Sequence, residues 1–110
     1  MDLNIVVLAG RLAAAPEVRV FEHGATLVRY LVTTRNERPR RRVDVVPVVL
    51  WDPDDETPVD LEAGQRVFVA GSIQRRFWDA GDGRRSRIEV VAHHVELNDD
   101  PAFSEETSTG

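Results

Sequence analysis

AGQRVFVAGSIQRRFWDAGDGRRSRIEVVAHHVEL, residues 63–97, contains two long runs of strand-like composition on either side of the five residues DAGDG. The runs are Arg66 to Trp78 and Arg84 to Leu97, and both are rich in β-branched residues with apolar positions in alternation. The glycines and aspartates between them are typical of a tight hairpin turn. The stretch therefore predicts a long β-hairpin with aromatic residues and arginine pairs near its tip.

The residues before this hairpin predict three more long strands, Asn4 to Leu12, Thr26 to Thr34 and Val43 to Trp51. A short alternating segment, Val18 to Phe21, ends in a turn. Residues 52–65 have a weak pattern that allows at most a short helical turn. Five long strands with glycine turns predict an all-β fold, a small five-stranded barrel with a short or absent helix.

The chain of 110 residues is long enough for one domain, which we place at residues 1–97. Residues 98–110 are polar and charged, and we expect them to form a disordered acidic tail. The chain has no cysteine, and no apolar run reaches the ~18 residues of a membrane span. The first residues lack the basic start of a signal peptide. We therefore expect a cytoplasmic protein without membrane contact.

Charge is unevenly distributed along the chain. The formal net charge is -5, yet six acids lie between residues 52 and 62 and five more from residue 96 onward. The remaining segments, 1–51 and 66–95, hold 14 arginines against eight acids, a balance of +6. A basic body with two acidic segments predicts an anionic partner for the body.

Alternation in the strand Arg66 to Trp78 places Trp78 on the same face as Gln74 and Arg76. An indole on such a polar face either folds over the sheet edge or stays open as a stacking surface beside cations. Unpaired bases expose π-faces, and each base stacked on an aromatic ring contributes ~1–3 kcal/mol whatever its identity. The second alternative predicts binding of single-stranded nucleic acid.

Strand alternation decides less about the other candidate binding residues. Trp51 ends a strand in which both faces are apolar, so the sequence leaves it open between core and surface. Phe21 and Tyr30 are expected to be packing residues. The candidate phosphate contacts are all arginines, and they lie in the loop before the third long strand (Arg38, Arg40, Arg41, Arg42) and on both sides of the hairpin turn (Arg75, Arg76, Arg84, Arg85). The alternative for the loop run is an ordinary solvated surface.

Residues that would support catalysis or metal binding are poorly placed. His93 and His94 are adjacent on a strand, and His23 lies in a turn without a spaced partner. The paired carboxylates lie in polar loops, without an apolar pocket that would raise a pKa. We expect neither an enzyme nor a metal site nor a cofactor.

The order of these features resembles the bacterial single-stranded DNA-binding protein family, which has an OB-fold. The likeness runs from Asn4 to about Leu97, through NIVVLAGRLAAAPEVRVFEHGATLVRYLVTT, VVPVVLW and residues 63–97. It implies that Trp78 and Trp51 stack on bases and that Arg19 and Arg76 stand at basic positions of the family. It also implies homo-oligomers, tetramers or dimers, and roles in DNA replication, recombination or repair near the nucleoid.

The sequence departs from the family pattern in three places. The loop of residues 35–42 has no tryptophan, and Val45 and Val46 stand where a Trp-His pair is frequent. The stretch Asp99 to Phe103 resembles the acidic tip through which family members recruit replication and repair proteins, but seven residues follow it. Because these aromatic positions are missing, we expect weaker and more salt-sensitive binding than in a family member that has them. Two alternatives stay open: a replication-restart accessory resembling primosomal replication protein N, or a structural or protein-interaction OB domain.

Overall fold

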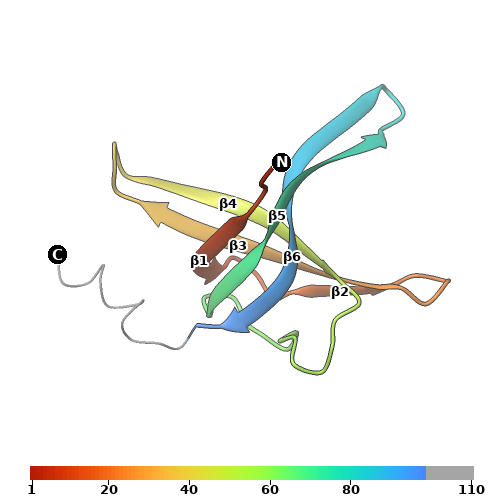
Figure 1. The fold of residues 1–110 in the computed structure, drawn as a ribbon, viewed down its shortest axis with the longest axis horizontal. Helices are drawn as coiled ribbons and strands as arrows, with labels where there is room; N and C mark the ends of the chain where they lie inside the picture. The colour runs from red at the N-terminus through yellow and green to blue at the C-terminus, as the bar shows by residue number, and fades with distance from the viewer. Residues whose placement is uncertain (99–110) are drawn as a thin grey trace.

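A computed structural model describes residues 1–98 as a single twisted sheet closed into a barrel (Figure 1). The strands are β1 (Val6–Leu12), β2 (Glu17–Val20), β3 (Thr26–Asn36), β4 (Arg42–Trp51), β5 (Arg66–Asp79) and β6 (Arg84–Leu97). The five long strands are the predicted ones, and the short alternating segment is β2. Residues 1–98 contain no helix, so the weak segment between β4 and β5 remains irregular. The predicted acidic tail, including its Asp99–Phe103 stretch, lies outside the described residues apart from Asn98.

Closure of the barrel depends on two short pairings. β3 pairs along one edge with β4, and it shares its other edge between β2, opposite Thr26 to Arg29, and β1, opposite Val32 and Thr33. β1 continues antiparallel to β5, and β5 to β6. The ring is completed where β4 and β6 run parallel for two residue pairs, Val48 with Val90 and Val49 with Val91.

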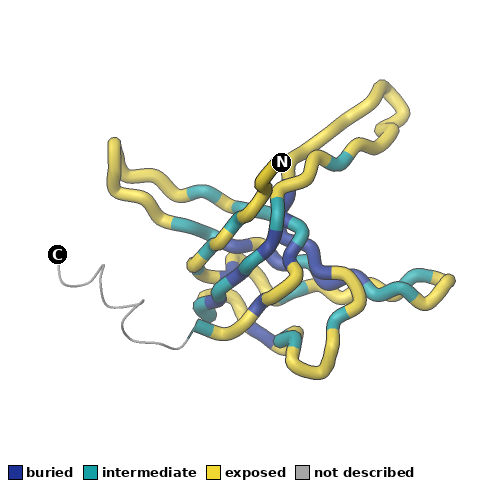
Figure 2. Tube along the Cα trace, viewed as in Figure 1, coloured by how far each residue is buried: buried dark blue, intermediate teal, exposed yellow. Residues whose placement is uncertain are grey.

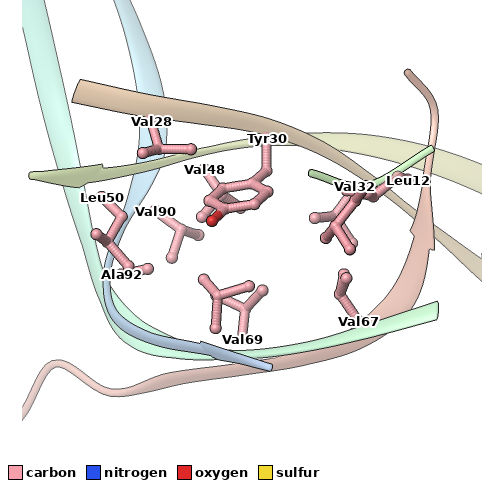
Figure 3. Packing of buried hydrophobic residues seen from close by; sticks show 12 residues of the cluster. Leu12, Val28, Tyr30, Val32, Val48, Leu50, Val67, Val69, Val90 and Ala92 are labelled. Carbon is pink, nitrogen blue, oxygen red and sulfur yellow. The ribbon is translucent and has the colours of Figure 1, made fainter. Parts of the chain in front are cut away.

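The core is an aliphatic cluster around one tyrosine (Figure 3). Alternate residues of the strands point inward, as the 2-residue period requires, and the labelled members are Leu12, Val28, Tyr30, Val32, Val48, Leu50, Val67, Val69, Val90 and Ala92. Tyr30 was expected to be a packing residue, and it is fully buried.

A β-bulge in β6 lets apolar side chains on both sides of it point into the core. Ala70 pairs with His94 and Gly71 with Ala92, so His93 is the extra residue of a β-bulge. Val90, Ala92 and Val95 can then all be buried although their spacing changes. A Cβ added at Gly71 would collide with the carbonyl oxygen of Val91, so only glycine fits this close approach.

The segment between β4 and β5 covers one end of the core. Leu61 is buried in the cluster, and the Tyr30 hydroxyl donates a hydrogen bond to the carbonyl oxygen of Pro58 at 2.7 Å. A turn at the start of the segment is held by the Asp54 carboxylate, which accepts from the Thr57 hydroxyl at 3.0 Å and from the Glu56 amide at 2.9 Å. The hydrogen bond from Thr57 lowers the pKa of Asp54 below its ordinary value.

Three hairpins extend beyond the barrel, β2–β3, β3–β4 and β5–β6 (Figure 1). Their tips are mostly exposed, whereas buried residues gather where the strands cross (Figure 2). The hairpins place polar and aromatic side chains outside the core without disturbing its packing.

Replacement of Tyr30 by phenylalanine tests the hydrogen bond that joins the core to the segment between β4 and β5. Burial raises the pKa of Tyr30 to about 12, so the unfolded chain loses this proton before the folded one does. The stability that this difference in pKa contributes is therefore fully present below pH ~10, the ordinary tyrosine pKa, and is lost as the pH rises toward about 12. The chain has one tyrosine, no lysine and no cysteine, so little else titrates in that window.

Tyr30→Phe should lower the free energy of unfolding at neutral pH by about 1 kcal/mol through the lost hydrogen bond. It should also flatten the alkaline decline of stability, measured by urea unfolding between pH 9 and 12. An equally steep decline in the variant would contradict the assignment to Tyr30.

Candidate nucleic-acid interface

The part of the β5–β6 hairpin that projects from the barrel, residues 74–89, has two different faces, and we call it the arm. Residues that pair directly across an antiparallel ladder share a face. On one face the pairs are Gln74 with Glu89, Arg76 with Arg87 and Trp78 with Arg85; on the other they are Arg75 with Ile88 and Phe77 with Ser86. The first face is thus polar and basic around one indole, and the second is partly apolar.

Trp78 lies open on the basic face. Its residue is 40% exposed, and the guanidinium carbon of Arg76 lies 5.8 Å from the ring centroid. An accessible π-face with a cation beside it suits an unpaired base flanked by phosphate. Arg85, directly across the ladder, donates to Asp82 at 2.7 Å and is more than half exposed.

The four arginines near the hairpin tip are divided between the two faces. Arg76 and Arg85 lie with Trp78, whereas Arg75 lies with Phe77 and donates to the Ser86 hydroxyl at 3.1 Å. Arg84 places its guanidinium 4.6 Å from the Phe77 centroid. The four therefore do not line one groove together, because adjacent residues of a strand point to opposite sides.

The basic face continues onto the outside of the barrel. Across the β4–β6 contact, Val49 pairs with Val91 on the outward side, and Arg29 of β3 pairs with Val49. We call this continuous side of β3, β4, β6 and β5 the outer face; it includes Trp51, Arg29, Val49, Val91, Arg87 and Trp78. Its middle contains a buried carboxylate, Glu89, whose side chain is 1% exposed.

Glu89 is partly satisfied by its neighbours. One carboxylate oxygen accepts from the Gln74 amide at 3.3 Å, and the other lies 3.8 Å from the Arg87 guanidinium without a hydrogen-bond partner. The Arg29 Nε likewise has no hydrogen-bond partner among the described residues. Polar groups thus extend from the arm to the centre of the outer face.

Trp51 occupies the other end of the outer face and is 48% exposed. It pairs with Leu27, which pairs in turn with Arg19 of β2, so these three side chains lie in one row. The Phe21 ring contacts the indole at a centroid distance of 5.6 Å, and the Arg19 guanidinium lies 4.9 Å from the Phe21 centroid. The structure thus resolves the open question about Trp51 in favour of the surface.

The two indoles lie on the same side of the sheet but far apart. From Trp51 the path runs two residues along β4 to Val49, across to Val91, and six residues along β6 to the partner of Trp78. At a rise of about 3.3 Å per residue, this path along the two strands is roughly 26 Å long. A ligand that touches both must be extended.

The β3–β4 hairpin contributes the densest group of arginines. Arg38, Arg40, Arg41 and Arg42 are all exposed. Arg41 pairs with Glu37 at 3.5 Å and Arg42 with Asp44 at 3.0 Å. A cavity of about 360 Å³ is lined here by Arg35, Glu37, Arg41 and Val43.

The histidines and carboxylates form no recognisable metal centre in the described part of the chain. His93 and His94 are both exposed, and His94 lies 3.5 Å from Glu96. Within residues 1–98, no group of three or more His, Cys, Asp or Glu side chains is placed to hold a metal ion. No helix in the same residues is long and apolar enough to cross a bilayer.

Sequence reasoning missed several outer-face residues, namely Phe21, His23, Arg29, Arg35 and Arg87. Arg87 could have been found, because counting outward from the DAGDG turn places it opposite Arg76. Arg29 could not, because its position depends on the pairing of β3 with β4.

The model of the "Single-strand binding protein family" matches residues 3–98 of the chain. The chain belongs to this family. Among curated relatives, a single-stranded DNA-binding protein of Clostridium tetani is 33% identical over 101 residues, covering 86% of this chain and 70% of the relative. A single-stranded DNA-binding protein of Halalkalibacterium halodurans is also 33% identical over 101 residues, and this match covers 86% of the present chain and 60% of that relative.

A solved structure has the same architecture. It is described as "Plasmodium falciparum SSB complex with ssDNA", and it superposes with a TM-score of 0.76 at 22% identity, covering 90% of this chain and 97% of that one. The likeness confirms the predicted OB-fold barrel, to which the short β2 strand adds a sixth element.

Proposed function

We propose that this protein binds single-stranded DNA without strong sequence preference, through base stacking and arginine–phosphate contacts. The observation that supports this best is the pair of exposed indoles, Trp51 and Trp78, on one side of the sheet with guanidinium groups between and beside them. The role needs no catalytic step and no cofactor.

The chemistry of the outer face favours a single strand over a duplex. Each stacked base contributes ~1–3 kcal/mol and is available only when unpaired. Arginines bind phosphate with bidentate geometry and add cation–π contacts. The proposed contacts combine the predicted residues with the arginines found on the outer face: Trp51, Trp78, Arg19, Arg29, Arg35, Arg38, Arg40, Arg41, Arg42, Arg76, Arg85 and Arg87. Arg75 and Arg84 lie on the back of the arm, and we assign them a lesser part.

The relatives support the same role. Those reported above are named single-stranded DNA-binding proteins, and the solved neighbour is described as a complex with ssDNA. We extend this to a general role in DNA replication, recombination or repair in the cytoplasm, close to the nucleoid.

We also propose that the protein is a homo-oligomer that assembles through β1. Residues Val6 to Gly10 pair with β5 on one edge only, because β1 meets β3 only at Arg11 and Leu12. Ile5 and Val7 are 67% and 57% exposed beside this free edge. An unpaired strand edge with apolar side chains is a ready surface for a second strand.

A second candidate function, a protein-interaction domain, is favoured by one observation. On the back of the arm, Phe77 and Ile88 are each 51% exposed, next to Ile73 at the base of the hairpin. If this surface and not the outer face were the functional one, nucleic acid would bind weakly and without change in tryptophan emission.

A titration with oligo(dT) tests the proposed function. Binding should quench tryptophan emission, and Trp78→Ala should weaken the binding about 5- to 150-fold, the loss of ~1–3 kcal/mol for one stacked base. The logarithm of affinity should fall with the logarithm of salt concentration, with a slope of about -0.7 for each phosphate neutralised. Duplex of matched sequence is the control, and equal affinity for the two would contradict the proposal.

Two neighbouring arginines test which face of the arm binds. Arg76→Ala removes the cation beside Trp78 and should reduce both affinity and the size of the salt slope, by about 0.7 for a single phosphate contact. Arg75→Ala removes the same charge from the opposite face and should have a clearly smaller effect. Fluorescence titrations over a salt series measure both. Equal losses would argue against the outer face as the binding side.

A charge at the free edge of β1 tests assembly. Val7→Asp should shift the protein toward monomer in sedimentation velocity, because burying an unpaired carboxylate at the new interface is costly. Val18→Asp on β2, 51% exposed in the folded chain, is the control and should leave the oligomeric state unchanged. Identical sedimentation of wild type and Val7→Asp would exclude this edge as the interface.

A further inference from the structure

Three rings form a strip at the β2–β3 turn, at the Trp51 end of the outer face. Phe21 lies between the other two: its centroid is 5.6 Å from that of Trp51, at an interplanar angle of 32°, and 5.9 Å from that of His23, at 43°. Phe21 is partly covered, whereas Trp51 and His23 are both exposed. The outer two rings are therefore open to a ligand while the middle ring supports them.

The backbone holds this strip in place. The amide of Gly24 donates to the carbonyl oxygen of Phe21 at 2.9 Å, and the amide of Phe21 donates to that of Ala25 at 2.8 Å, which closes the turn that bears His23. Gly24 has a φ of 95°, a conformation that glycine adopts without strain. Such a turn presents the imidazole from a defined position and not from a freely moving loop.

A second set of hydrogen bonds fixes the tryptophan side. The Asp52 amide donates to the carbonyl oxygen of Thr26 at 2.7 Å, and the Thr26 amide donates back to the Asp52 carboxylate at 3.0 Å. The residue after Trp51 is thereby tied to the start of β3. Both outer rings of the strip are thus attached to hydrogen-bonded backbone.

A cation completes the cluster. The Arg19 guanidinium lies 4.9 Å from the Phe21 centroid, so one side of that ring is already occupied. Because Phe21 is also partly covered and lies against both other rings, it has little free face for a base and instead fixes the orientation of the rings beside it. Arg19 is exposed and can contact a phosphate next to a base stacked on the strip.

We propose that Trp51 and His23 form a two-nucleotide subsite, in which two successive bases of a single strand stack on the two rings and Arg19 contacts a phosphate beside them. Phe21 is the positioning residue of this subsite. The inference rests on the proposed function, and it adds a base-contacting residue, His23, on a turn that the sequence marked as a turn but not as part of a binding site. Flat imidazole rings stack on bases as other aromatic side chains do, so the subsite tolerates any base.

The test uses the full chain with Trp78→Phe, in which Trp51 is the sole tryptophan and its emission reports this end of the outer face alone. Into it are placed His23→Ala, Phe21→Ala and Phe21→Tyr, each checked by thermal unfolding. Val20→Ala is the matched control, since Val20 is 68% exposed and ends β2 immediately before Phe21 but points to the other side. Each protein is titrated with oligo(dT) while Trp51 emission is recorded.

His23→Ala should weaken binding at least about fivefold, the lower end for one stacked base. Phe21→Ala should weaken binding similarly and reduce the quenching of Trp51 at saturation, whereas Phe21→Tyr should restore both, because the ring is retained. Val20→Ala should match its parent. A folded Phe21→Ala protein with unchanged quenching would overturn the positioning role.

The failure of this inference can be told apart from the failure of the proposed function. If the Trp78→Phe parent binds and is quenched, but His23→Ala binds equally well, the two-nucleotide subsite is wrong and single-stranded DNA binding stands. If neither wild type nor the parent binds oligo(dT) at low salt, both proposals are overturned.

Discussion

The parallel contact between β4 and β6 is the constraint on which the rest of the structure depends. Only Val48 with Val90 and Val49 with Val91 are paired there, which is enough to close the ring around the core. Beyond these pairs the two strands diverge, so β4 continues with β3 and β6 continues with β5 as separate hairpins (Figure 1). The short contact therefore leaves the far ends of the β3–β4 and β5–β6 hairpins free to extend from the barrel.

Alternation along the strands lets the same segments form both the core and the outer face. Val67 and Val69 of β5 are fully buried, and the same strand continues to Arg76 and Trp78 on its other parity. From Ile73 onward the inward parity has no core left to enter, which is why Ile73 and Phe77 are exposed. The β5–β6 hairpin is therefore buried where it joins the barrel and exposed at its tip. Side chains at the tip can be replaced with little effect on the free energy of folding.

The sequence was sufficient for the five long strands, the hairpin turn and the placement of Trp78 beside Arg76, since each rests on local alternation or turn chemistry. It was insufficient for Trp51, because both parities of β4 are apolar and only the folded chain, in which Trp51 is exposed and Val49 on the same parity pairs with Arg29, shows which is outward. It was also insufficient for the bulge at His93, which no local pattern marks. The division of the four tip arginines between the two faces follows from alternation alone, whereas grouping all four as phosphate contacts rested on their proximity in the sequence.

The net charge of -5 gives little information about the outer face, because charges act locally in salt solution. With a screening length of about 10 Å at 0.1 M salt, distant acids do not cancel arginines at the arm or the β3–β4 hairpin. Two acids near the outer face are engaged by the fold: Asp52, next to Trp51, accepts from the Thr26 amide, and Glu89 is buried against Gln74 and Arg87. An acidic chain can thus present a basic surface, since the position of each charge on the sheet, and not the total, sets the local potential.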